Sequence, residues 1–150
     1  MFERYTERAR RVIFFGRYEA SQFGTPVIEP EHLLLALLRE EKNLIGTLLG
    51  NKPLVSPEFI RKQIESQIPK AKKISTSVDL PLAPATQRVL ANAHEESDRL
   101  NHKHIGTEHI VLGLLREEQS FSASLLVEAG LSLESVRQRI RKLQVEIPWN

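Results

Sequence analysis

The chain has 150 residues, 41% hydrophobic and 27% charged, a composition typical of one globular domain or of two small repeats that share a core. Its 21 Lys and Arg residues exceed its 19 Asp and Glu residues by only two, which argues against a strongly basic nucleic-acid or membrane-surface binder. Because the chain contains no Cys, disulfides, Cys-ligated zinc and thiol catalysis are excluded. No apolar run approaches 18 residues and no apolar signal region is present, so we expect a cytoplasmic protein without a membrane segment.

The first half of the chain predicts four helices. The first begins after Thr6, whose hydroxyl suits an N-cap, and ends at Gly24. One face of this helix is apolar at helical spacing, through Ala9, Val12, Ile13, Gly16, Ala20 and Phe23. Apolar segments predict short helices at about 30–41 and 44–50, and the fourth opens at Ser56-Pro57-Glu58. Period-two alternation is not sustained anywhere, so we expect no strands.

The second half repeats this series after a polar connection at residues 69–79. A helix that starts at Pro84 is followed by helices at about 107–118 and 121–129, and a last one opens at Ser132-Leu133-Glu134. The apolar face of the first of these consists of Thr86, Val89, Leu90, Ala93, Ser97 and Leu100.

An internal repeat underlies this similarity. Glu31-His32 and the apolar helix that ends in Arg-Glu-Glu recur at Glu108-His109, 77 residues later, and the offset slips by one in the last helix. We therefore predict an all-α domain with a pseudo-twofold relation between two four-helix units, about eight helices in all. Repeat one covers about 2–68, the linker about 69–80 and repeat two about 81–147.

The opening Phe2-Glu3-Arg4-Tyr5-Thr6-Glu7-Arg8-Ala9, the two Glu-His helices and Gly106-Thr107 together resemble the Clp amino-terminal repeat domain. That domain heads ClpC-type AAA+ unfoldases and also occurs as a stand-alone Clp-N protein. The resemblance implies a substrate- and adaptor-binding module that works with an AAA+ Clp ATPase ring and the Clp peptidase; a stand-alone regulatory protein that binds the Clp machine is the alternative. We expect no catalysis and no cofactor, with ATP used by a separate module, because Gly46 to Lys52 lacks the Gly-Lys-Ser/Thr end of a phosphate loop.

In the ClpC branch, the resemblance further implies that Glu31 and Glu108 receive phosphoarginine on unfolded or arginine-phosphorylated substrates, with Thr107, His32 and His109 beside them. A carboxylate can bind the guanidinium through two hydrogen bonds, and a helix N-terminus can hold the phosphoryl group. The alternative is structural, because the helix dipole alone favours Glu in a first turn. Repeat one has Glu29-Pro30 where repeat two has Gly106-Thr107, so the sequence favours Glu108 as the main site.

Three further groups of residues have weaker interpretations. His32 and His109, with His102 and His104 nearby, suggest a metal, but without Cys we expect these histidines to pack or hydrogen-bond instead, and we predict no metal site. Phe2, Tyr5 and Arg10 are candidate adaptor-docking residues, or Phe2 packs as a staple on the first helix. Arg137, Arg139, Arg141 and Lys142 keep a helical nucleic-acid binder open as a remote alternative, although a solvated face is the usual interpretation. We expect Trp149, which follows the last helix, to pack against this core or against another domain.

Overall fold

The structure is a computed structural model that describes residues 2–146. These residues form eight helices, as the sequence predicted. The helices are α1 (Glu7–Phe23), α2 (Pro30–Glu40), α3 (Leu44–Leu49), α4 (Pro57–Gln67), α5 (Pro84–Arg99), α6 (Thr107–Arg116), α7 (Phe121–Glu128) and α8 (Leu133–Glu146). The predicted carboxyl boundary at about 147 and Trp149 lie outside the described residues.

The helix ends follow from local chemistry. The hydroxyl of Thr6 accepts the amide hydrogen of Ala9 at 3.1 Å and caps α1, which ends at Gly24 with φ of 72°. Proline occupies the first position of α2, α4 and α5, where its missing N–H removes no helical hydrogen bond. The helix expected at 107–118 ends two residues earlier, at Arg116.

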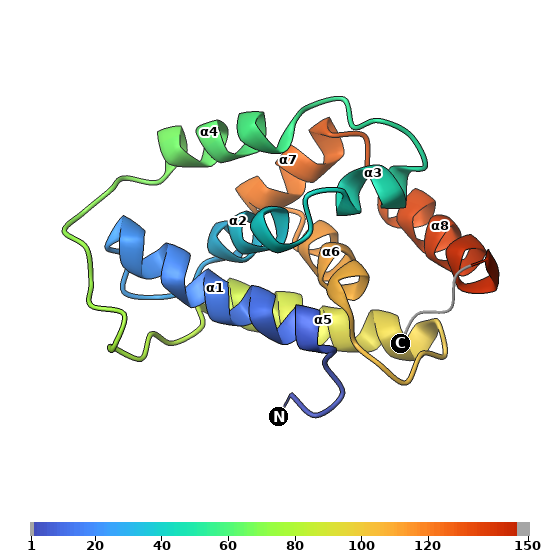
Figure 1. Ribbon diagram of the computed structural model, residues 1–150, viewed down its shortest axis with the longest axis horizontal. Helices are drawn as coiled ribbons and strands as arrows, with labels where there is room; N and C mark the ends of the chain where they lie inside the picture. The colour runs from blue at the N-terminus through green and yellow to red at the C-terminus, as the bar shows by residue number, and fades with distance from the viewer. Residues whose placement is uncertain (1, 147–150) are drawn as a thin grey trace.

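The core lies around the two apolar helices α2 and α6. In Figure 1, α1 and α5 run along one side of the molecule, α2 and α6 lie in the middle, and α3, α4 and α7 lie on the other side. Every residue of α2 from His32 to Leu38 is buried, as is every residue of α6 from Thr107 to Leu115. Burial on all sides explains why these helices are apolar on every face after their first turn, from Leu33 to Leu38 and from Ile110 to Leu115.

Two short backbone pairings tie each repeat to the other. Tyr5 forms an isolated parallel bridge with Ile105, and Ile28 forms an isolated parallel bridge with Leu82. The two bridges are equivalent, because Leu82 and Ile105 follow Tyr5 and Ile28 by the repeat offset of 77 residues. The segment that leads into each repeat therefore pairs with the loop before the central helix of the other repeat.

Among the described helices, none combines the length and the apolar character that crossing a membrane requires.

Candidate functional site

The two Glu-His elements stand at the N-termini of the central helices, and their histidines cap those helices. Nδ1 of His32 accepts the amide hydrogen of Glu29 at 2.9 Å, and Nδ1 of His109 accepts that of Gly106 at 2.9 Å. Each histidine thus does what Glu or Gln does at the third position of a capping box. Both side chains are fully buried, and burial lowers the pKa of each to about 4, so both are neutral at pH 7. The two histidines position the helix starts and are not presented to a ligand.

The carboxylate of Glu31 crosses from repeat one to repeat two. Its Oε2 accepts hydrogen bonds from the amide of Ser122 at 3.1 Å and from the Ser122 hydroxyl at 2.9 Å. Ser122 is the second residue of α7, so a negative charge lies at the positive end of that helix. The Glu31 side chain is only half-buried, and no described residue donates a hydrogen bond to its Oε1.

Glu108 is oriented differently, although it is the repeat equivalent of Glu31. The residue is only 2% exposed, and its Oε2 lies 3.1 Å from Nε2 of His104. Burial acts to raise the pKa of Glu108, but the hydrogen bond from His104, with the electrostatic effect of the adjacent histidines, holds the pKa below its ordinary value. The carboxylate folds back over Gly106, where a Cβ atom would collide with Oε1, so only glycine permits this arrangement.

The difference between the two glutamates has a local cause. The repeat equivalent of Ser122 is Ile45, whose side chain offers no hydrogen-bond donor to Glu108, whereas His104 does. Glu31 thus has access to solvent and Glu108 does not, although the sequence favours Glu108 as the main site; which glutamate binds a ligand stays a prediction. Thr107, expected to assist Glu108, is itself only 4% exposed. At the other site, burial and the charge of Glu31 raise the pKa of Glu29, consistent with crowding of negative charge there.

Four side chains in repeat two form what we call the histidine cluster: His102, His104, Glu108 and His109. One potential metal-ligand atom from each lies within 4.8 Å of all the others. Because Nδ1 of His109 accepts the Gly106 amide, its Nε2 carries the proton, which it donates to Nδ1 of His102 at 2.7 Å. These two bonds engage both ring nitrogens of His109, so His109 could bind a metal only by giving up the helix cap.

Repeat one shows what the cap looks like without the cluster. The positions equivalent to His102 and His104 hold Thr25 and Val27. Nε2 of His32 has no hydrogen-bond partner among the described residues, and the His32 ring meets the Phe23 ring edge-on at 5.5 Å. Capping is therefore the role that the two histidines share, and the hydrogen-bonded cluster is an addition of repeat two.

The expected docking residues at the amino-terminal end pack on one another. Tyr5 is buried, and its ring meets that of Phe2 edge to face at 5.1 Å. The guanidinium of Arg10 donates to the backbone oxygen of Phe2 at 3.2 Å and to that of Glu3 at 3.4 Å. This geometry fits the staple interpretation of Phe2 and leaves Arg10 as the exposed member of the three. Docking at this end stays a prediction.

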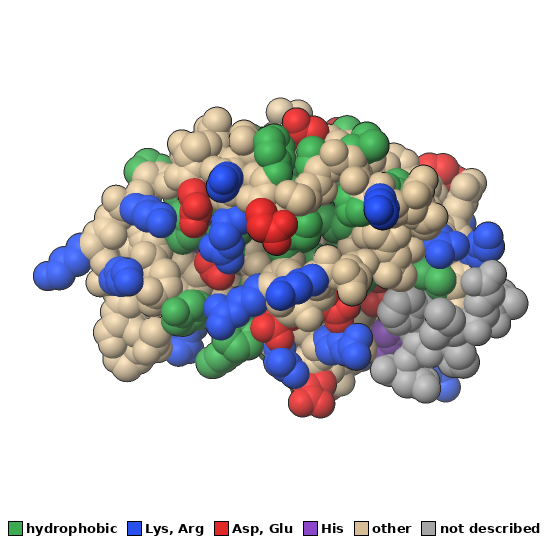
Figure 2. Space-filling view, turned by 45° about the horizontal axis from the view of Figure 1, so that its top comes forward, with side chains coloured by type: hydrophobic (Ala, Val, Ile, Leu, Met, Phe, Trp, Pro, Cys, Tyr) green, Lys and Arg blue, Asp and Glu red, His purple; other side chains and the backbone are tan. Residues whose placement is uncertain are grey.

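Two of the four basic residues of α8, Arg137 and Arg139, hydrogen-bond within the fold, whereas Arg141 and Lys142 are exposed. Arg137 donates two hydrogen bonds to the fully buried carboxylate of Glu96, at 2.8 and 2.6 Å, and Arg139 donates to the backbone oxygen of Thr47 at 2.9 Å. In Figure 2, cationic and anionic side chains are interspersed over much of the visible face. A nucleic-acid interface would need a continuous basic surface, so the structure gives that alternative no support.

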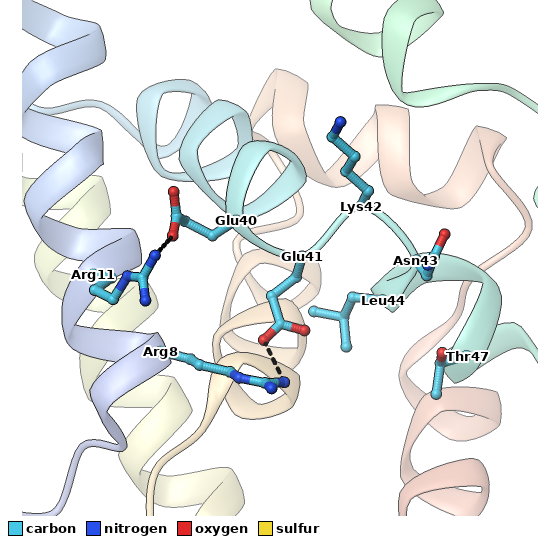
Figure 3. A pocket seen from close by; sticks show the side chains of 8 residues that line it. All are labelled: Arg8, Arg11, Glu40, Glu41, Lys42, Asn43, Leu44 and Thr47. Atoms are coloured by element: carbon cyan, nitrogen blue, oxygen red, sulfur yellow. Dashed lines mark hydrogen bonds and ion pairs between the residues drawn. The ribbon is translucent and has the colours of Figure 1, made fainter.

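A hollow of about 520 Å³ lies between α1, the end of α2 and the start of α3 (Figure 3). Arg11 pairs with Glu40 at 2.8 Å and Arg8 with Glu41 at 3.3 Å, while Lys42 points away from both arginines. The first pair has an equivalent in repeat two, Arg88 with Glu117 at 2.6 Å. The arginines of this hollow are thus occupied by pairs that the Arg-Glu-Glu helix ends supply, which indicates a structural role.

Comparison with known proteins identifies the class to which this arrangement belongs. The family model of the Clp repeat N-terminal domain matches residues 4–129 and 84–148, so the chain belongs to this family. Among solved structures, the N-terminal domain of the chaperone ClpD from Arabidopsis thaliana is similar, with a TM-score of 0.72, 27% identity and coverage of 96% of this chain and 97% of that one. The Hsp104 N-terminal domain from Candida albicans, at 17% identity and a TM-score of 0.71, shares the fold.

Among curated relatives, this chain is 36% identical over 143 residues to the negative regulator of genetic competence ClpC/MecB of Bacillus subtilis. It is 34% identical over 143 residues to the chaperone protein ClpB of Oceanobacillus iheyensis. Each match covers 95% of this chain but 17% of the relative, so the chain spans about a sixth of these relatives' length.

Proposed function

We propose that this chain is the substrate- and adaptor-receiving module of a ClpC-type ATP-dependent unfoldase, which passes proteins to the Clp peptidase in the cytoplasm. The observation that carries the proposal is the match, over 95% of the chain, to a relative named ClpC. In this proposal the chain binds proteins and catalyses nothing, and ATP is used by a separate AAA+ module.

Within this role, we propose that the chain recognises phosphoarginine on marked proteins, and that Glu31 is the residue that binds it. Glu31 is half-buried and open to solvent, and its Oε1 remains available for a guanidinium. The N-terminus of α7 lies beside the same carboxylate, and helix N-termini favour phosphoryl groups. Glu108 would have to break its contact with His104 and leave the core before it could bind a ligand.

Calorimetric titration with free phosphoarginine tests the assignment. We expect a dissociation constant of about micromolar order for the native chain and a loss of about tenfold or more in Glu31→Gln, which removes the charge but keeps the shape. Glu108→Gln is the matched variant from repeat two and should leave the affinity unchanged. A loss of affinity in Glu108→Gln but not in Glu31→Gln would instead assign the binding site to Glu108.

A capture experiment tests the wider role. Immobilised chain is offered arginine-phosphorylated casein and the same casein without phosphorylation, and the bound fraction is measured. Preferential capture of the phosphorylated form, reduced in Glu31→Gln, supports the proposal. Capture of neither form contradicts substrate reception by this chain.

A further inference from the structure

A second hollow, of about 370 Å³, lies between α1, α2, α4 and the connection that follows α4. We call it the α1–α4 hollow. Its lining residues are Tyr18, Glu19, Gln22, Phe23, Arg39, Arg61, Glu65, Lys70 and Lys73. Four cationic side chains thus face two carboxylates, in a chain whose total net charge is only +2. In Figure 2, Lys and Arg side chains predominate at the end of the molecule where this connection runs.

Both repeats contain the same ionic unit at this place. In repeat one the buried carboxylate of Glu19 accepts hydrogen bonds from both ends of the Arg61 guanidinium, at 3.3 and 2.9 Å, and Arg39 lies 4.0 Å away. In repeat two the equivalent residues are Glu96, Arg137 and Arg116. The ionic unit of repeat two therefore serves as a reference for the charged residues of the α1–α4 hollow in repeat one.

The copies differ in how the second arginine is satisfied. Arg116 lies 3.0 Å from Glu95 and 3.1 Å from Glu96, so it has two carboxylates within 3.1 Å. The position of Glu95 is held in repeat one by Tyr18. The guanidinium of Arg39 accordingly lies over the Tyr18 ring at 5.3 Å and over the Phe15 ring at 4.6 Å.

Because Tyr18 stands where repeat two has the carboxylate of Glu95, Arg39 can bind an anion from another molecule. Its side chain is 45% exposed, compared with 24% for Arg116, and its nearest carboxylate is at the limit of an ion pair. Aromatic contacts fix the plane of a guanidinium while its N–H edges can still bind a carboxylate through two parallel hydrogen bonds. Lys70 and Lys73 add positive charge at the rim, and the ammonium of Lys70 lies over the Phe23 ring at 5.5 Å.

We propose that the α1–α4 hollow binds an acidic segment of a partner protein, with an Asp or Glu carboxylate on Arg39. An adjacent apolar side chain of that segment packs against Tyr18. Complementary charge favours rapid and selective encounter with such a segment, and the aromatic ring supplies an anchor. The inference rests on the proposed role as a receiver of proteins and names a surface of that role distinct from Glu31.

Peptide binding measured by fluorescence anisotropy tests the inference. The probe is a fluorescein-labelled twelve-residue peptide of alternating Glu and Leu, and its control has Gln in place of every Glu. We expect the Glu peptide alone to bind, with an affinity that falls as sodium chloride rises from about 50 to about 200 mM. Equal binding of the Gln peptide would overturn the proposal.

Two variant pairs locate the binding. Tyr18→Glu recreates the carboxylate of repeat two and should raise the dissociation constant about tenfold, whereas Tyr18→Phe keeps the ring and should leave it unchanged. Lys70→Ala with Lys73→Ala should weaken binding severalfold more than the charge-matched pair Lys52→Ala with Lys103→Ala, whose side chains are exposed elsewhere. Equal affinities within both pairs would refute the site.

The same proteins separate this inference from the proposed function. Capture of arginine-phosphorylated casein depends on Glu31 and should persist in the Tyr18 and lysine variants. If casein is captured while the acidic peptide does not bind, only the hollow is overturned. If both fail, the role as a receiver of proteins fails with it.

Discussion

Replacing Glu96 with Gln should destabilise the domain strongly, because Glu96 is a fully buried carboxylate that neutralises two arginines. Arg137 and Arg116 bind it at 2.6 and 3.1 Å, and their side chains are only 16% and 24% exposed. Removing one partner of a buried ion pair costs about 3–5 kcal/mol because it leaves charge uncompensated. Since both arginines keep some water, we expect about 3 kcal/mol, which lowers the urea midpoint by about 1.5 M.

The equivalent change in repeat one supplies the control. Glu19→Gln removes the same group, but Arg61 and Arg39 are 38% and 45% exposed and can turn to water. We therefore expect about half the loss, about 1.5 kcal/mol. Urea unfolding followed by circular dichroism measures both variants under the same conditions. A loss in Glu19→Gln equal to or larger than that in Glu96→Gln would refute the reasoning from burial.

The effect of Glu96 also has a definite pH dependence. Burial acts to raise the pKa of Glu96, but the hydrogen bonds and charge of Arg137, together with Arg116, hold it below its ordinary value of 4.5. The unfolded chain therefore binds this proton more readily than the native one, so stability falls as the solution is acidified below about pH 5. The difference in stability between the native chain and Glu96→Gln should shrink over that range and stay constant near neutrality.

Three other expectations follow from packing and from the histidines. Gly113→Ala should cost at least about 2 kcal/mol of stability, because the added Cβ would collide with the backbone oxygen of Val89. Gly16→Ala should cost less, because there the added Cβ meets the flexible end of the Leu33 side chain at 3.0 Å, and thermal melts compare the two variants. Because burial lowers the pKa of His32 from 6.5 to about 4, protonation favours the unfolded chain, and stability should fall as the pH drops from 6.5 towards 4. His32→Gln keeps an acceptor for the helix cap but does not titrate, so urea titrations at pH 7 and 5 should show a smaller fall in stability for this variant. Zinc at about tenfold excess should shift the melting temperature by less than about 1 °C, because His109 would have to give up the Gly106 cap to complete the site, and a clear rise would show that the histidine cluster binds metal.

Much of the fold could be predicted because its signals are local or repeated. Thr6, Gly24 and the proline at the first position of a helix act within one turn, and the 77-residue offset doubles every signal. These features fix where helices begin and end, and the structure confirms an all-helical domain of eight helices within its described residues. The two backbone bridges could not be predicted, because a single paired residue leaves no alternation in the sequence.

The candidate site was harder to predict because its outcome depends on contacts distant in sequence. The direction of Glu31 is set by Ser122, which lies 91 residues away, and that of Glu108 by His104 and the glycine beneath it. Sequence reasoning placed both glutamates correctly at helix starts but ranked them by their immediate neighbours. It also missed that Arg137 pairs with Glu96, although Glu19 and Glu96 recur on the buried faces of equivalent helices and carried the signal.

The exchanged pairing at Tyr5–Ile105 and Leu82–Ile28 has a consequence for how such a chain could arise. A single four-helix unit would leave the backbone groups of both paired segments without their partners. Two identical units related by a twofold axis would supply these partners to each other. The present polypeptide therefore has the architecture that head-to-tail fusion of the subunits of an intertwined homodimer would produce. The two halves nevertheless differ at individual positions, as where Tyr18 in one half stands opposite Glu95 in the other.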